Sequence, residues 1–139
     1  MRHQSAQGGL VLVVDDFQDG REMCVEYLSF LGYQAAEASD GFEALHRARA
    51  LMPDVILMDL SLPGIDGWEV TRRLKADPLT HRIPIVAVTA HSLPGDAERA
   101  RRAGCDGFVT KPCFLDELLE EIQRVIHKGD DTRDGVRRS

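Results

Sequence analysis

The residues best suited to chemistry are polar side chains that each directly follow a short apolar run. They are the acidic pair Asp15-Asp16 and, further along the chain, Asp59, Thr89 and Lys111. Three carboxylates gathered in one place repel one another unless a cation lies among them, and Mg²⁺ prefers such oxygen ligands. A metal-bound carboxylate beside a lysine can accept a phosphoryl group, because both cations offset charge on the phosphoryl oxygens. Thr89 offers a hydroxyl to one of those oxygens.

These residues can act together only if the fold brings the ends of the apolar runs to one edge. The pattern predicts strands at 10–14, 34–38, 55–58, 85–88 and around Phe108-Val109, and helices at 19–31, 42–51, 68–76, 96–103 and 115–126. Strands that alternate with helices predict right-handed crossovers and a mainly parallel sheet covered by helices on both sides. Ligands of such α/β folds bind at the carboxyl ends of the strands, so Asp15, Asp59 and Lys111 are expected to be neighbours.

The composition indicates one compact domain and argues against several classes of partner. The chain has 139 residues, of which 43% are hydrophobic, and a formal net charge of −6. Nucleic-acid binding needs a concentrated basic face, so this charge argues against it. No apolar run approaches the roughly 20 residues of a membrane-spanning helix, and the polar start of the chain is too short for a signal peptide. A cytoplasmic protein is therefore expected.

The polar groups lie in motifs that resemble the receiver domain family of two-component signalling. The motifs are Val13-Val14-Asp15-Asp16, Leu57-Met58-Asp59-Leu60-Ser61-Leu62-Pro63-Gly64 with Asp66-Gly67, Val88-Thr89-Ala90, and Gly107-Phe108-Val109-Thr110-Lys111-Pro112. Each motif is weak alone, but together they follow the family order, each at the end of a predicted strand. The resemblance implies a flavodoxin-like, doubly wound (βα)5 fold with a five-stranded parallel sheet in the strand order 2-1-3-4-5. The resemblance covers roughly residues 11–126, and with the polar ends of the chain it predicts a receiver domain at 10–128 between disordered segments at 1–9 and 129–139.

The resemblance also implies a phosphoryl-acceptor site that works with Mg²⁺. Asp59 is expected to accept the phosphoryl group. Asp16 and Asp59 are expected to bind the metal through their carboxylates, and Ser61 through its backbone carbonyl. Asp15 is expected to reach the metal mainly through water.

A further set of residues is expected to carry the signal outward. Thr89 resembles the switch hydroxyl that moves toward the phosphoryl group, and Lys111 resembles the lysine that pairs with that group. Phe108 takes the place of an aromatic residue that swings inward with Thr89, without the hydroxyl of the tyrosine often found there. The implied phosphodonor is a histidine kinase or a histidine phosphotransfer protein. The implied readout is a face formed by the helix at 96–103, the strand around Phe108 and the last helix, which binds a downstream protein.

Other interpretations of the same residues stay open. A phosphatase of the haloacid-dehalogenase kind also uses an aspartate nucleophile, but it typically has a second acid where this chain has Ser61. A degenerate receiver that only binds partners is disfavoured by the complete set of site residues. A dinucleotide-binding domain is disfavoured because Asp15-Asp16 stands where a glycine-rich turn is expected. The receiver is either a stand-alone regulator, which the start at Met1 favours, or part of a larger chain such as a hybrid histidine kinase.

Overall fold

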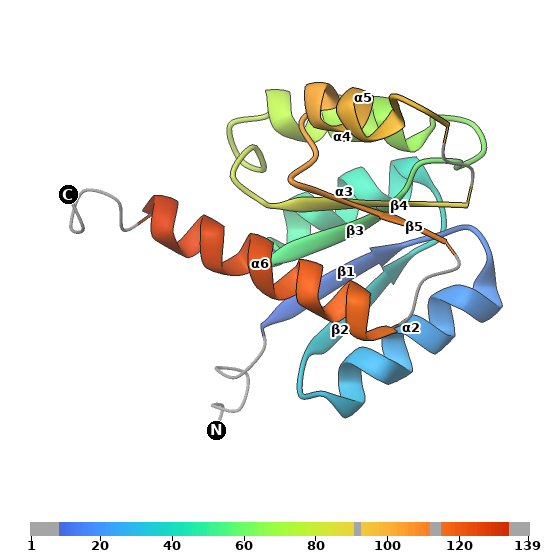
Figure 1. The fold of residues 1–139 in the computed structure, drawn as a ribbon, viewed down its shortest axis with the longest axis vertical. Helices are drawn as coiled ribbons and strands as arrows, with labels where there is room; N and C mark the ends of the chain where they lie inside the picture. The colour runs from blue at the N-terminus through green and yellow to red at the C-terminus, as the bar shows by residue number, and fades with distance from the viewer. Residues whose placement is uncertain (1–8, 91–92, 112–114, 134–139) are drawn as a thin grey trace.

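Strands and helices alternate along the chain in the order that the sequence predicts. The computed structural model describes residues 9–90, 93–111 and 115–133. Figure 1 shows the elements, which are β1 (Leu10–Val14), α2 (Gln18–Phe30), β2 (Gln34–Ala38), α3 (Gly41–Leu51), β3 (Val55–Asp59), α4 (Gly67–Ala76), β4 (Ile85–Thr89), α5 (Asp96–Ala103), β5 (Gly107–Thr110) and α6 (Leu115–Arg133).

The strands form one parallel sheet with the order β2-β1-β3-β4-β5, which confirms the predicted flavodoxin-like arrangement. The inner strands β1, β3 and β4 are buried along almost their whole length, because helices cover both faces of the sheet. Their aliphatic runs therefore show no alternation of polar and apolar residues. The strand order also makes the carboxyl ends of β1 and β3 immediate neighbours, at the point where the order reverses.

The two faces of the sheet bury separate apolar clusters. Helices α3, α4 and α5 cover one face, where side chains such as Leu12, Ile56 and Ile85 pack against them. Helices α2 and α6 cover the other face, where Leu28 and Ile122 meet the alternate strand positions. Figure 1 shows this division, with α2 and α6 on the opposite side of the sheet from the remaining helices. Both layers leave the carboxyl ends of the strands free to carry polar groups.

Side-chain caps explain why two helices begin one residue earlier than predicted. The carboxylate of Asp40 accepts a hydrogen bond from the backbone N–H of Glu43, and Asp66 does the same for Glu69. Aspartate at such a position satisfies a backbone donor that the helix itself leaves without a partner. The residues after the caps, Gly41 and Gly67, therefore become the first helical residues.

The last helix is longer than the sequence predicts. The apolar stripe of α6 ends near Ile126, and the expected disordered tail begins at residue 129, yet the helix continues to Arg133. The turn beyond the apolar stripe continues a helix that is already formed, so it avoids the cost of helix nucleation. In the described part of the chain, no helix combines the length and apolar character needed to cross a membrane.

Candidate functional site

The acidic turn after β1 is held by hydrogen bonds from two of its backbone N–H groups. The backbone N–H of Asp15 donates to the carbonyl of Ala38 at the end of β2, over 3.1 Å. The Asp15 carboxylate then accepts a hydrogen bond of 2.9 Å from the backbone N–H of Phe17. Asp15 is buried and Asp16 is exposed, so the turn places one carboxylate under the surface and the next at it.

The third carboxylate, that of Asp59, ends strand β3. Its residue is only 6% exposed, and its Oδ1 accepts a hydrogen bond of 2.9 Å from the backbone N–H of Ser61. Helix α4 begins in close contact with this strand end. The approach is so close that a Cβ atom added at Gly67 would lie 2.3 Å from the carbonyl oxygen of Asp59. No side chain fits in that space, so glycine is required for α4 to pack there. The hydrogen bond from its own N–H holds the Ser61 backbone beside the Asp59 carboxylate.

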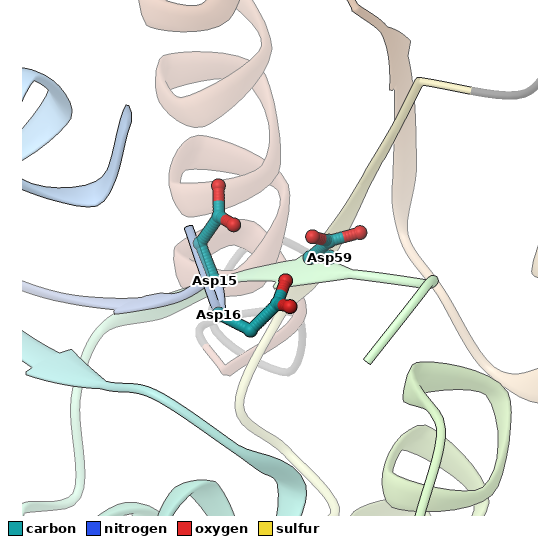
Figure 2. Close-up of side chains that lie close together, drawn as sticks. All are labelled: Asp15, Asp16 and Asp59. Carbon is teal, nitrogen blue, oxygen red and sulfur yellow. The ribbon is translucent and has the colours of Figure 1, made fainter. Parts of the chain in front are cut away.

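The ends of β1 and β3 bring the three carboxylates together. Asp15, Asp16 and Asp59 each offer an oxygen, and these oxygens all lie within 4.8 Å of one another. Figure 2 shows the side chains converging from the two strand ends. This donor set fits Mg²⁺, which binds oxygen ligands and usually takes one or two carboxylates while it keeps several waters.

Lys111 supplies the positive charge of the site. Its Nζ donates to Oδ2 of Asp15 over 2.9 Å and lies 3.8 Å from Oδ2 of Asp59. Its backbone N–H donates to the carbonyl of Thr89 over 2.7 Å, which ties the end of β5 to the end of β4. Thr89 is buried at the end of β4, so the predicted switch residue lies at the same edge of the sheet.

The electrostatics of the site leave negative charge uncompensated. Burial raises the pKa of Asp59, and the neighbouring Asp15 raises it further, although the Ser61 N–H and Lys111 act in the opposite direction. For Lys111, burial alone would lower the pKa, but the hydrogen bond to Asp15 and the surrounding carboxylates raise it. Lys111 therefore stays protonated, and its single positive charge offsets only one of the three carboxylates. The remaining negative charge favours the binding of a cation.

Phe108 lies on the side of the sheet that α3, α4 and α5 cover. It is half-buried and packs against their apolar cluster, and its backbone N–H approaches the Glu121 carboxylate at 3.4 Å. The structure therefore places this predicted switch aromatic on β5, next to the strand that ends in Thr89. Pro112, the last residue of its motif, lies outside the described residues.

One residue of the site gives no motif signal in the sequence. The guanidinium of Arg21 on α2 donates from Nη1 to the backbone carbonyl of Asp15 over 2.8 Å. The only hint in the sequence is its spacing, since a residue in the first turn of a helix can point back to the strand end before it. The other site residues were all predicted from the motifs, and their roles stay predictions.

Comparisons with known proteins agree on one family. Residues 11–123 match the response regulator receiver domain family. The polar-differentiation response regulator DivK of Brucella anthropi is 38% identical over 113 residues, which cover 81% of this chain and 92% of that protein.

Solved structures support the same assignment. The receiver domain of a sensor histidine kinase from Pseudomonas aeruginosa, with a magnesium ion coordinated in its active-site cleft, is 36% identical, has a TM-score of 0.79 and is matched over 98% of its length, by 86% of this chain. A chemotaxis response regulator of Vibrio cholerae is 31% identical, with a TM-score of 0.80 over 86% of this chain and 99% of that one. These matches set aside the phosphatase-like and dinucleotide-binding interpretations. The chain belongs to the response regulator receiver family and is a receiver domain of two-component signalling.

Proposed function

We propose that this receiver accepts a phosphoryl group on Asp59 with the help of Mg²⁺. The observation that carries the proposal is the carboxylate cluster itself, with three acidic side chains whose oxygens lie within 4.8 Å and one lysine between two of them. Three carboxylates this close together repel one another, and a bound Mg²⁺ would offset that repulsion and the negative charge of an incoming phosphoryl group. The magnesium ion in the Pseudomonas aeruginosa relative supports the choice of metal.

In the proposed site, each residue has a part that its position allows. Asp16 and Asp59 would hold the metal through their carboxylates, Ser61 through its backbone carbonyl, and Asp15 through water. Mg²⁺, when bound, would shield the negative oxygens of the incoming phosphoryl group. Lys111 would neutralise the same oxygens from the side of β5, because its Nζ already lies 3.8 Å from the Asp59 carboxylate.

The proposed reaction is one displacement at phosphorus. A carboxylate oxygen of Asp59 attacks the phosphorus of a phosphohistidine, the P–N bond breaks, and the imidazole leaves with its electron pair and takes up a proton. The new P–O bond makes an acyl phosphate. Hydrolysis reverses the modification, because water attacks phosphorus, breaks that P–O bond, and regenerates the carboxylate with inorganic phosphate. The chain would thus carry one phosphoryl group at a time.

Intact mass after incubation with acetyl phosphate tests this proposal. With Mg²⁺, the wild-type protein is expected to gain one phosphoryl group, and removal of the metal with a chelator is expected to prevent it. Asp59→Asn is expected to gain none. Asp106→Asn is a matched control, because it removes another partly buried aspartate at the opposite edge of the sheet.

Each alternative gives a different outcome in the same assay. Multiple turnover of a small phosphate ester, which a receiver does not hydrolyse, would indicate a phosphatase. A wild-type protein that gains nothing, even from a phosphohistidine donor, would indicate a receiver that only binds partners. Modification of Asp59→Asn to the wild-type extent would place the acceptor elsewhere.

We further propose that phosphorylation is read through Thr89 and the surface formed by α5, β5 and α6. Thr89 lies at the end of β4, and Phe108 lies on the adjacent strand β5, which supports a linked movement of the two side chains. The donor would be a histidine kinase or a histidine phosphotransfer protein, and the target a downstream protein. The phosphoryl group would shift an existing equilibrium between two conformations.

The Thr89→Ala variant tests this second step separately from phosphorylation. It is expected to accept the phosphoryl group on Asp59 but to lose most of the difference in target affinity between the modified and unmodified forms. A Thr89→Ser variant keeps the hydroxyl and is expected to keep that difference. Unchanged target binding by the phosphorylated Thr89→Ala variant would rule out the proposed switch.

A further inference from the structure

We infer that Arg21 is a positioning residue that holds the Asp15-Asp16 turn in the shape that binds the metal. The inference rests on the proposed function, since it concerns the same acidic site. The hydrogen bonds of Arg21 go to the backbone carbonyl of Asp15 and to the carboxylate of Glu37, and not to the three carboxylates of the acidic cluster. It would therefore act on the metal site through the backbone.

The contacts of Arg21 join three elements at the acidic edge. From the first turn of α2, its Nη1 donates to the carbonyl of Asp15 over 2.8 Å, and its Nε donates to Oε1 of Glu37 on β2 over 2.7 Å. The Arg21 side chain is only 13% exposed, so water competes little for these bonds. A buried carbonyl needs a donor, and loss of the guanidinium would leave that of Asp15 without this one.

The carbonyl of Asp15 matters because it belongs to the peptide group that joins Asp15 to Asp16. The orientation of this planar group sets the direction in which the Asp16 side chain leaves the backbone. The two neighbouring bonds of the turn, from Phe17 N–H to Asp15 Oδ1 and from Lys111 Nζ to Asp15 Oδ2, hold the Asp15 side chain instead. Arg21 thus holds the peptide group that leads into Asp16, and so restrains the direction of the Asp16 side chain.

The chemistry of the pair fits a role beside a cation site. An arginine fork presents two donors in fixed directions, so it can bind a carbonyl and a carboxylate at the same time, whereas lysine offers a single nitrogen centre. Glu37 also balances the charge of the guanidinium. The pair therefore supplies a rigid donor beside the acidic cluster without cancelling the negative charge that attracts the metal.

The test combines magnesium titration with a measurement on the metal-free backbone. Titration of MgCl₂ by calorimetry is expected to show at least tenfold weaker binding for Arg21→Met, in the range usual for the loss of a group that orients a metal ligand. In metal-free protein, NMR is expected to show shifted signals and faster hydrogen exchange for the amides of Asp16 and Phe17. Arg21→Lys is expected to restore part of the affinity, because its ammonium can still reach one acceptor.

Two control variants separate positioning from stability. Val25 lies on the same helix as Arg21, and the Val25→Ala substitution weakens the packing of α2 on the sheet. This variant is expected to have a lower melting temperature and an unchanged Mg²⁺ affinity. Glu37→Gln keeps the bond from Arg21 to Asp15 and is expected to change the affinity by less than about threefold. If Arg21→Met does not fold, the comparison of Arg21→Lys with Glu37→Gln carries the test.

The outcomes distinguish the inference from the proposed function. Wild-type Mg²⁺ affinity and wild-type Phe17 exchange in Arg21→Met would overturn the inference, and so would an equal loss of affinity in Val25→Ala. If the wild-type protein itself binds no Mg²⁺, the proposed function fails, but the amide exchange of Asp16 and Phe17 still decides whether Arg21 holds the turn.

Discussion

The sheet carries one lysine–aspartate pair where its strands end, here called the carboxyl edge, and another where β4 and β5 begin, here called the amino edge. The two pairs differ in what surrounds them. At the carboxyl edge, Lys111 Nζ lies 2.9 Å from Asp15. At the amino edge, Lys75 Nζ lies 3.1 Å from Asp106. The two distances are close to each other, so geometry alone does not tell a functional pair from a structural one.

The amino-edge pair is complete within itself. Lys75 at the end of α4 also donates to the carbonyls of Ile83 and His81, at 2.8 and 3.3 Å. The same carboxylate oxygen of Asp106 that binds Lys75 accepts the backbone N–H of Ile85, the first residue of β4, over 2.9 Å. Arg124 also donates to the backbone carbonyl of Asp106, but its charge is balanced by Glu121. The charges at this edge are therefore balanced, and the hydrogen bonds of Lys75 and Asp106 join α4 to β4 and to the start of β5.

The carboxyl-edge pair is incomplete by comparison. One lysine faces three carboxylates there, and burial raises the pKa of Asp59 among them. A balanced pair stabilises the fold, whereas an unbalanced cluster costs stability until a ligand arrives. The difference teaches that an excess of like charge, rather than the presence of an ion pair, distinguishes the edge where we propose the phosphoryl-acceptor site.

Removal of Lys111, the lysine of the proposed site, is expected to give the largest effect. Lys111→Met is expected to slow phosphorylation by acetyl phosphate about 100-fold or more, equivalent to about 2.7 kcal/mol, because the phosphoryl oxygens lose a fixed positive charge. Intact mass followed over time, with Mg²⁺ in excess, measures the rate. A rate within about threefold of wild type would show that Lys111 is not needed in the transfer.

The matching change at the amino edge is expected to act on stability alone. Lys75→Met is expected to lower the free energy of unfolding by about 2 kcal/mol, since it leaves Asp106 and two carbonyls without their shared donor. Urea unfolding measures this loss, and the phosphorylation rate is expected to stay within about threefold of wild type. A large loss of phosphorylation rate in Lys75→Met would show that the amino edge also contributes to phosphorylation, and would contradict the comparison.

Magnesium is expected to stabilise the protein through one edge only. At a Mg²⁺ concentration ten times the dissociation constant, the free energy of unfolding is expected to rise by about 1.4 kcal/mol. Lys75→Met is expected to gain as much as wild type, whereas Asp16→Asn is expected to gain much less. Thermal unfolding with and without MgCl₂ measures the gain, and equal stabilisation of Asp16→Asn would place the metal elsewhere.

The sequence predicted the arrangement of the carboxyl edge better than that of the amino edge. The strands and helices follow from apolar runs and helical periods, and the strand order follows from the resemblance to receiver domains. The positions of Asp15, Asp59 and Lys111 follow from motifs at the strand ends. Lys75 and Asp106 belong to no motif and lie 31 positions apart, so nothing local predicts that they meet. Contacts of this kind depend on how α4 packs on the sheet, which the sequence pattern does not specify.

Arg21 and α6 show the same limit in other forms. Arg21 reads as an ordinary charged residue of a helix, because a bond from its side chain to a strand carbonyl leaves no periodic signal. The end of α6 was placed at the end of its apolar stripe, although the backbone continues the helix to Arg133. Apolar patterns report burial, whereas helix ends and side-chain bonds to the backbone depend on polar contacts.

The smallest expected effect is the change in stability when an aspartate is replaced by asparagine, and it has opposite signs for Asp59 and Asp106. Burial raises the pKa of Asp59 above its ordinary value of 3.8, so the folded protein binds this proton more tightly than the unfolded chain does. The ionised carboxylate therefore lowers stability as the pH rises from 3.8 through the raised pKa. In metal-free buffer near pH 7, Asp59→Asn is expected to be more stable than wild type, because the neutral amide avoids the cost of burying a charge beside Asp15, and the gain should vanish in acid.

Asp106→Asn is expected to lose stability near pH 7, because it weakens the bond to Lys75. Urea unfolding from about pH 4 to about pH 7 compares the two variants, and a loss in both would mean that the carboxyl edge is as well balanced as the amino edge.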